Sequence, residues 1–238
     1  MKILSLHPET CELADFGPRE ERFCYLLHEA WLKGLLCAGN GNASWLLPEP
    51  QANLALITAK GTFKGHLARN DLSYLHLPSG QLYRGQALSS ETGVHLALYR
   101  STKAQAILHT HPPKLLALEL MLKRQKEEGA CQNLVELLTK LPIYESARWQ
   151  GFLGMVKAHL PGSNELALAV EAEANNLLKK NQECANYGAI WLSQHGLCAW
   201  GADLNFALAL SEEMEHLANI ALLANILKLP DGQRSFLC

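Results

Sequence analysis

The chain has 238 residues, of which 48% are hydrophobic and 18% charged, and this composition allows a substantial buried core. Its 21 Lys and Arg against 23 Asp and Glu leave a net charge of −2, which argues against nucleic acid or an anionic membrane as a partner. The length suits one domain, which we expect to cover residues 1–238. No apolar run is long enough for a secretory signal or a spanning helix, so the sequence predicts a cytoplasmic protein that binds small molecules.

The N-terminal half reads as one helix followed by a meander of strands. Pro18 suits the first turn of a helix, and apolar residues from Phe23 to Leu35 recur at helical spacing, which predicts a helix over 18–37. Short apolar or alternating segments follow, separated by turn residues, and this pattern is typical of antiparallel strands. We expect these strands over residues 43–47, 54–58, 73–77 and 81–84.

The C-terminal half alternates between helices and strands. Its apolar spacing predicts helices over residues 90–100, 113–128, 164–180 and 203–228, the last of which opens at Asp203, a good N-cap residue. Strands are expected over residues 106–111 and 187–193. Helices interleaved with strands predict an α/β fold.

A His-x-His pair ends the strand expected over residues 106–111. Side chains two residues apart in a strand lie on one face, so His109 and His111 can present both imidazoles to a single metal ion. Pro112 and Pro113 then end the strand. Taken alone, the pair could also be two partly exposed histidines without a shared ligand.

His195 is the candidate third ligand, because Gly196 after it allows a tight turn from which a side chain can reach into a cleft. By spacing alone, a turn histidine hydrogen-bonded to the backbone is the better reading. The seven cysteines show no Cys-x-x-Cys spacing, so a cysteine-rich zinc module is not expected. Three neutral imidazoles with an open position suit Zn²⁺ best and tolerate Mn²⁺, Fe²⁺ or Co²⁺.

Five segments together resemble the class II aldolase/adducin family, in family order, over roughly residues 18–225. They are Gly41-Asn42-Ala43-Ser44, Leu56-Ile57-Thr58-Ala59-Lys60-Gly61, Ser89-Ser90-Glu91-Thr92, His109-Thr110-His111 and Gln194-His195-Gly196. The resemblance implies a single three-layer α/β/α domain around a mostly antiparallel sheet. It also implies a fourfold-symmetric homotetramer, a small phosphorylated sugar as substrate, and a divalent metal on the three histidines.

The resemblance also implies a phosphate site. Its residues would be Gly41, Asn42, Thr58, Lys60, Gly61, Ser89 and Ser90. Glycine allows close backbone approach, and amides or hydroxyls at a helix start favour an anion. Aldolases of the family carry a small hydroxyl residue where this chain has Lys60, whose ammonium could hold a phosphate or another acidic group, or could be a solvated surface lysine.

Glu91 is the acid/base residue that the resemblance implies, since the corresponding Glu of the aldolases removes a proton from the carbon beside a metal-bound carbonyl. The expected reaction is cleavage of a ketose 1-phosphate into dihydroxyacetone phosphate and an aldehyde. Alternatively, Glu91 is a first-turn residue favoured by the helix dipole. His95, one turn later, could be a ligand but more commonly such a residue packs on the helix face.

A dehydratase resembling methylthioribulose 1-phosphate dehydratase is the alternative reaction, with Glu145 competing with Glu91 as the base. Tyr144 could donate a proton or could be a half-buried core tyrosine. A sugar-phosphate 4-epimerase is less expected, because known epimerases carry Asp at the place of Glu91. A non-catalytic module of the adducin type is also less expected, because such members lack the metal histidines.

Overall fold

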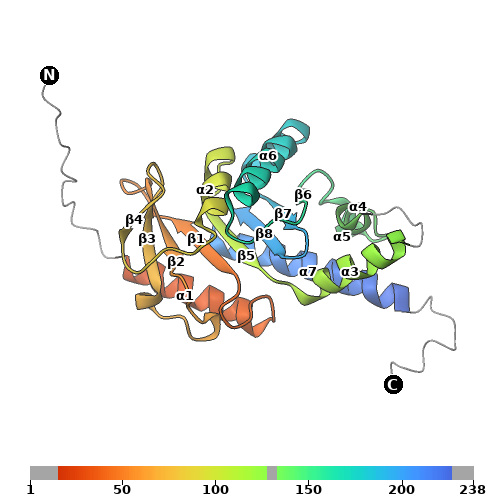
Figure 1. Ribbon diagram of the computed structural model, residues 1–238, viewed down its shortest axis with the longest axis horizontal. Helices are drawn as coiled ribbons and strands as arrows, with labels where there is room; N and C mark the ends of the chain where they lie inside the picture. Colours follow the sequence, from red (N-terminus) through yellow and green to blue (C-terminus); the bar gives the residue numbers. More distant parts are fainter. Residues whose placement is uncertain (1–15, 128–132, 227–238) are drawn as a thin grey trace, which may run out of the picture.

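A computed structural model describes residues 16–127 and 133–226 of the chain. Its centre is an eight-stranded sheet with the order β4-β3-β2-β1-β5-β8-β7-β6 (Figure 1). Neighbouring strands are antiparallel except for β6 and β7, which are parallel. The sheet is therefore mostly antiparallel, as predicted.

The strands and helices have the following bounds. The strands are β1 Asn42–Leu46, β2 Leu54–Thr58, β3 Leu72–His76, β4 Gln81–Arg84, β5 Ala106–Thr110, β6 Leu153–Val156, β7 Gly188–Leu192 and β8 Gly196–Gly201. The α-helices are α1 Gly17–Leu32, α2 Thr92–Ser101, α3 Pro113–Glu127, α4 Leu134–Thr139, α5 Tyr144–Ala147, α6 Asn164–Lys180 and α7 Leu204–Ile226. Three short 3-10 turns are η1 Lys64–His66, η2 Arg69–Asp71 and η3 Gln182–Ala185.

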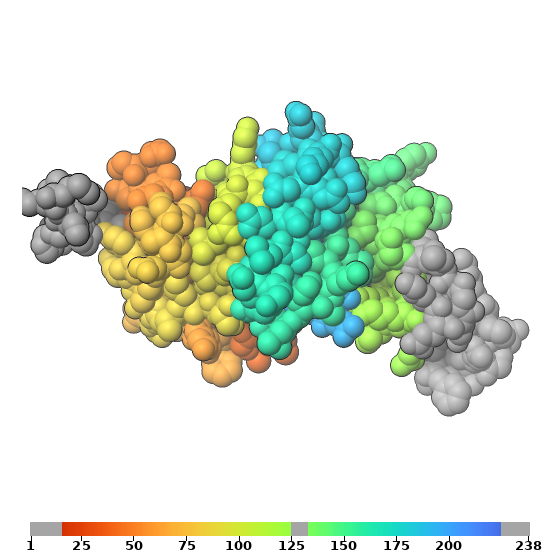
Figure 2. All heavy atoms as spheres, turned by 45° about the horizontal axis from the view of Figure 1, so that its top comes forward, coloured from red at the N-terminus to blue at the C-terminus, as the bar shows by residue number. Residues whose placement is uncertain are grey.

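Helices cover both faces of the sheet. On one face α2 packs against α6, and on the other α7 packs against α1 and α3 (Figure 1). In the space-filling view the segment around α6 lies across the middle of one face, beside the strands of the N-terminal half (Figure 2). The three-layer α/β/α fold predicted from the sequence is confirmed. Over the two described stretches, no helix is both long enough and apolar enough to cross a membrane.

The first helix is shorter than predicted, because it ends at Leu32 rather than near residue 37. Gly34 adopts a φ of +74°, and its amide donates to Trp31 O at 2.9 Å. The amide of Leu35 donates to Ala30 O at 3.0 Å, which completes a Schellman C-cap. Leu35 is buried beyond this cap, so its place in the apolar pattern reflects core packing and not helix.

Other boundaries also differ from the prediction. Helix α2 begins at Thr92 with Glu91 as its N-cap residue, so Ser90 precedes the helix. The elements α4, α5, β6 and β8 were not predicted, since segments this short show no periodicity that sequence alone can separate from a loop. Residue 128 and residues 227–228 of the predicted helices lie outside the described residues.

Strand register brings the site together at one end of the central strands β1, β5 and β8. Asn42 at the start of β1 pairs with His109 near the end of β5, and His109 pairs with Cys198 near the start of β8. Because these neighbours run antiparallel, the start of β1, the end of β5 and the start of β8 meet. Segments distant in sequence therefore meet at the end of β5.

Candidate metal centre

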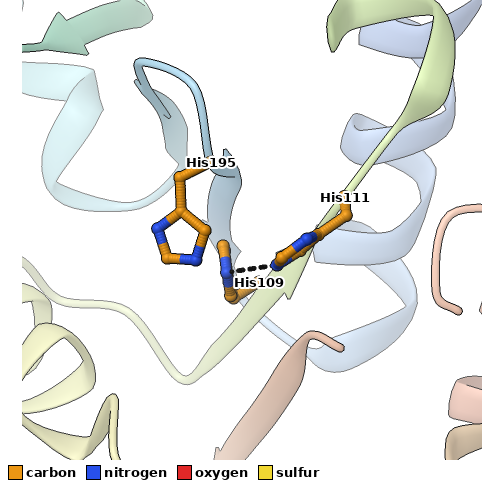
Figure 3. Close-up of side chains that lie close together, drawn as sticks. All are labelled: His109, His111 and His195. Carbon is orange, nitrogen blue, oxygen red and sulfur yellow. Dashed lines mark hydrogen bonds between the residues drawn. The ribbon is translucent and has the colours of Figure 1, made fainter. Parts of the chain in front are cut away.

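Three imidazoles converge where β5 ends and β8 begins. His109, His111 and His195 each offer a ring nitrogen, and these three nitrogens lie within 4.8 Å of one another. Figure 3 shows His109 and His111 on one segment facing His195, which comes from the turn between β7 and β8. The structure thus brings together the three candidate ligands that the sequence suggested.

The protonation of His109 follows from its partners. Its Nδ1 lies 3.1 Å from the carbonyl oxygen of Leu197, which can only accept, so Nδ1 carries the proton and Nε2 is bare. Burial lowers the pKa of both His109 and His111 to about 3, which keeps both rings neutral at physiological pH. A neutral imidazole with a free nitrogen is the form that ligates metals.

The arrangement fits a divalent transition metal. The Nε2 atoms of His109 and His111 are 3.0 Å apart (Figure 3), and two nitrogens bound to one tetrahedral zinc are separated by about 3.3 Å. Two buried polar atoms at the site, Nδ1 of His195 and Oε1 of Glu91, have no hydrogen-bond partner. Such unpartnered atoms are costly in a protein interior unless something else satisfies them.

Glycines allow the backbone to close around the three imidazoles. A Cβ atom on Gly196 would lie 2.2 Å from the carbonyl oxygen of Thr110 and 3.0 Å from Cε1 of His109. A Cβ atom on Gly41 would lie 2.6 Å from the carbonyl oxygen of His109, and Gly41 has a φ of +77°. A side chain at either position would push β5 away from the segment that carries the glycine.

Two buried glutamates accept hydrogen bonds from the segments that carry the histidines. Glu215 of α7 accepts from the amides of Lys114 and Leu115 at 3.1 Å each, and so caps the helix that begins just after His111. Glu119 of α3 accepts from the amide of Gln194 at 2.9 Å and from the Ser193 hydroxyl at 2.5 Å. Gln194 has a φ of +62°, so these bonds hold a strained turn immediately before His195.

Sequence reasoning missed both of these glutamates. Burial raises the pKa of Glu119, but the bonds from Ser193, Gln194 and Lys123 outweigh it and lower the pKa overall. The available signal was a single glutamate within an otherwise apolar helical stripe, between Leu118 and Leu122. A charge in such a stripe must have buried partners.

Glu91 lies directly beside the imidazoles. Its Oε2 is 3.3 Å from Nε2 of His109, and its Oε1 is 3.2 Å from Nε2 of His195. The side-chain amide of Asn42 donates to Oε2 at 2.7 Å. The carboxylate is 8% exposed, so it is desolvated but open to the cavity.

A cavity of about 280 Å³ opens in front of this cluster. Its lining includes the residues expected to bind phosphate: Gly41, Asn42, Thr58, Lys60, Gly61, Ser89 and Ser90. Glu91, His111 and His195 line the same cavity. Lys60 and Ser90 are exposed, whereas the Thr58 hydroxyl is buried and accepts from the amide of Ala43 at 3.4 Å.

Lys64 is a further lining residue that the sequence did not single out. Lys64 is 2% exposed, and its ammonium donates to Thr62 O at 2.7 Å, Thr62 Oγ1 at 3.2 Å and Gly39 O at 3.3 Å. Burial lowers the pKa of Lys64 to about 8. With these donors engaged, its side chain ties two loops of the cavity wall together and leaves a buried positive charge beside the cavity.

The structure keeps the remaining candidates away from the imidazoles. Glu145 is exposed, and Tyr144 is 97% exposed on the short helix α5, so the core reading of Tyr144 is wrong. Neither residue lines the cavity. His95 is fully buried on α2 and bonds to Asn42 and Ser44 instead of joining the three histidines.

Comparisons with known proteins agree with this geometry. A relative from Haemophilus influenzae, a 3-oxo-tetronate 4-phosphate decarboxylase, is 29% identical over 79% of this chain and 79% of its own length. A methylthioribulose-1-phosphate dehydratase from Pseudomonas fluorescens is 26% identical over 68% of this chain and 74% of its own. The fold is also that of a sugar-phosphate aldolase from Thermotoga maritima, with a TM-score of 0.71 at 22% identity over 90% of this chain and 97% of that one. The family model described as "Class II Aldolase and Adducin N-terminal domain" matches residues 21–222, so the chain belongs to the class II aldolase and adducin family.

Proposed function

We propose that this protein is a metal-dependent lyase that breaks a carbon–carbon bond of a phosphorylated ketose, releasing dihydroxyacetone phosphate and an aldehyde. One observation carries the proposal, namely the Glu91 carboxylate held 3.2 to 3.3 Å from two of three convergent imidazoles at the inner end of a cavity. Family members act on small phosphorylated sugars and include aldolases, decarboxylases and dehydratases.

We assign metal binding and proton transfer to one end of the cavity and phosphate binding to the other. His109, His111 and His195 would hold a divalent cation, which when bound supplies Lewis-acid polarisation of a carbonyl and its neighbouring hydroxyl. In cleavage, Glu91 would accept the proton that the hydroxyl of the departing aldehyde loses and give it to the carbon left beside the carbonyl, and in the reverse direction it would take that proton from the carbon. Lys60, Ser89 and Ser90 line the outer part of the proposed site and would hold the phosphate.

Decarboxylation of a 3-oxo acid phosphate is the second candidate, and the Haemophilus influenzae relative favours it. In that reaction the bond to the carboxylate breaks, carbon dioxide leaves, and the electron pair stays on the carbon beside the carbonyl. A protonated Glu91 would then supply the proton to that carbon. The dehydratase reaction with Glu145 as base gains no support from the subunit, because Glu145 does not line the cavity.

Proton exchange tests the proposal. Metal-loaded protein is mixed with dihydroxyacetone phosphate in deuterated water, and the hydroxymethyl protons are followed by NMR. Stereospecific loss of one proton supports aldol chemistry if the Glu91→Gln variant does not show this loss. No exchange by protein that holds metal stoichiometrically rejects it, and release of carbon dioxide from 3-oxo-tetronate 4-phosphate then decides for the second candidate.

Three further predictions accompany the function. The family often forms oligomers, and we predict a homotetramer, which sedimentation equilibrium would measure. Zinc is the predicted metal, with manganese, iron and cobalt as alternatives, and elemental analysis of protein purified without added metal would distinguish them. Fractionation of cells would test the predicted cytoplasmic location.

A further inference from the structure

A line of buried polar side chains runs from Glu91 into the space between the sheet and α2. Asn42 joins Glu91 to His95, with 2.5 Å between Asn42 Oδ1 and His95 Nε2. His95 Nδ1 then lies 2.7 Å from Ser44 Oγ, and Ser44 Oγ lies 2.8 Å from the hydroxyl of Tyr99. Asn42, Ser44 and His95 are all buried. None of His95, Ser44 and Tyr99 lines the cavity, so the proposed reaction does not use them directly.

The direction of these hydrogen bonds can be assigned from Glu91 inward. The amide nitrogen of Asn42 donates to Oε2 of Glu91, so the amide oxygen faces His95. Nε2 of His95 therefore carries a proton, which it donates to Asn42 Oδ1. In a neutral ring Nδ1 is then bare and accepts from the hydroxyl of Ser44.

Burial supports this assignment at both histidine and tyrosine. It lowers the pKa of His95 to about 4, although Glu91 opposes the shift, so the ring is neutral near pH 7. It also raises the pKa of Tyr99, whose hydroxyl therefore keeps its proton and donates to Ser44 Oγ. Each donor thus points toward Glu91, and hydrogen bonds aligned in one direction polarise one another.

We propose that Tyr99, Ser44 and His95 are positioning residues that act through Asn42 to fix the Glu91 carboxylate against His109 and His195. The catalytic part of this proposal rests on the proposed function of Glu91. Asn42 also lines the cavity, so it belongs both to this chain and to the proposed substrate site. Loss of one link leaves a buried acceptor unsatisfied and allows the Asn42 amide to turn.

The first test reads the chain without any substrate. ¹⁵N NMR of histidine-labelled apoprotein distinguishes protonated from bare ring nitrogens, and we expect His95 to carry its proton on Nε2 alone. Ser44→Ala should shift the ring signals of His95, His109 and His195, because movement of Glu91 changes its contacts with the last two. Ser211→Ala is the control, since this buried serine bonds only within α7 and should leave those signals in place.

The second test measures proton exchange with dihydroxyacetone phosphate in the same variants. The loss of one hydrogen bond, worth about 1 kcal/mol, should lower kcat about fivefold in Ser44→Ala and less in Tyr99→Phe, with KM unchanged. Ser44→Thr, which keeps a hydroxyl, should restore kcat if the fold accommodates its methyl group. Visible spectra of cobalt-loaded protein should match the parent, because the three ligands are untouched.

Two results would overturn the inference. A proton on Nδ1 of His95 alone would reverse the chain, and protons on both nitrogens would make Ser44 an acceptor and break its single direction. Folded Ser44→Ala protein with unchanged histidine signals would show that the chain does not position Glu91. If the parent protein fails to exchange protons, the proposed function falls, but the NMR comparison still decides whether Glu91 is held in this way.

Discussion

The two ends of the cavity are built differently. At the metal end His109 lies on β5, His111 directly follows that strand and His195 lies in the turn before β8, and glycines, buried carboxylates and a line of hydrogen bonds leave these residues little freedom. At the anion end Lys60, Gly61, Ser89 and Ser90 lie on loops between elements, and Lys60 and Ser90 are exposed. Rigid placement suits groups that must meet reacting atoms, whereas loops can change with the substrate. This contrast matches a family whose members share a fold and differ in reaction.

Removal of one ligand should have the largest effect at the metal end. His195→Ala leaves two imidazoles, and we expect its metal affinity to fall by more than the roughly 10- to 100-fold typical of outer contacts. Chelator competition with cobalt measures this. His76→Ala, at an exposed bond to Ser79, serves as the control. If the variant binds metal as tightly as the parent, His195 is not a metal ligand.

Replacement of Glu119 should weaken metal binding from a distance. A glutamine there cannot accept from both Ser193 and Gln194 as the carboxylate does, so the strained turn before His195 should loosen. We expect about 10- to 100-fold lower affinity for Glu119→Gln. Glu136→Gln, which alters an exposed pair with Lys140, should leave the affinity unchanged. Equal affinities for both variants would contradict the bracing role.

Glycine substitutions compare the two ends directly. Gly196→Ala must displace the backbone of Thr110, and the free energy of unfolding should fall by about 3 kcal/mol or more. Gly61→Ala at the anion end meets no atom within 4 Å, so only its φ of +76° opposes the change, at about 1 kcal/mol. Urea titration of both variants measures the difference. Similar losses of unfolding free energy would mean that the two ends of the cavity are equally closely packed.

Lys60 should influence substrate binding more than turnover. Lys60→Ala removes an exposed charge, so KM for a phosphorylated substrate should rise about fivefold with little change in kcat. Steady-state kinetics provides the measurement, and Lys103→Ala, outside the cavity lining, is the matched control. A fall in kcat alone would place Lys60 with the reacting atoms instead.

The smallest expected effect is on stability in acid. The bonds to Glu119 lower its pKa below 4.5, so their stabilisation is complete above that pH and is lost as the pH falls through the folded-state value. The stability difference between the parent and Glu119→Gln should therefore shrink below about pH 4.5. Urea titrations at pH 7 and pH 4 would show it. A constant difference would mean that the Glu119 charge is unimportant.

The sequence predicted what periodicity and residue type encode. Helix α6 has the predicted bounds, and the fold class and family are confirmed, because long apolar stripes and the ordered segments around the histidines are local signals. Helix α1 was predicted too long, since Leu35 belongs to the core beyond a glycine cap. Glu119 went unassigned, and the hydrogen bonds of His95 were not predicted, because both depend on partners far along the chain.

Helix α3 connects the two halves of the metal centre. Its first turn follows His111 and is capped by Glu215, while Glu119 further along holds the turn before His195. We therefore expect His195 to reach its final place only when α3 has docked and α7 has packed against it. Tight metal binding should then appear late in folding, so a metal-sensitive spectrum would report the completed domain rather than its early collapse.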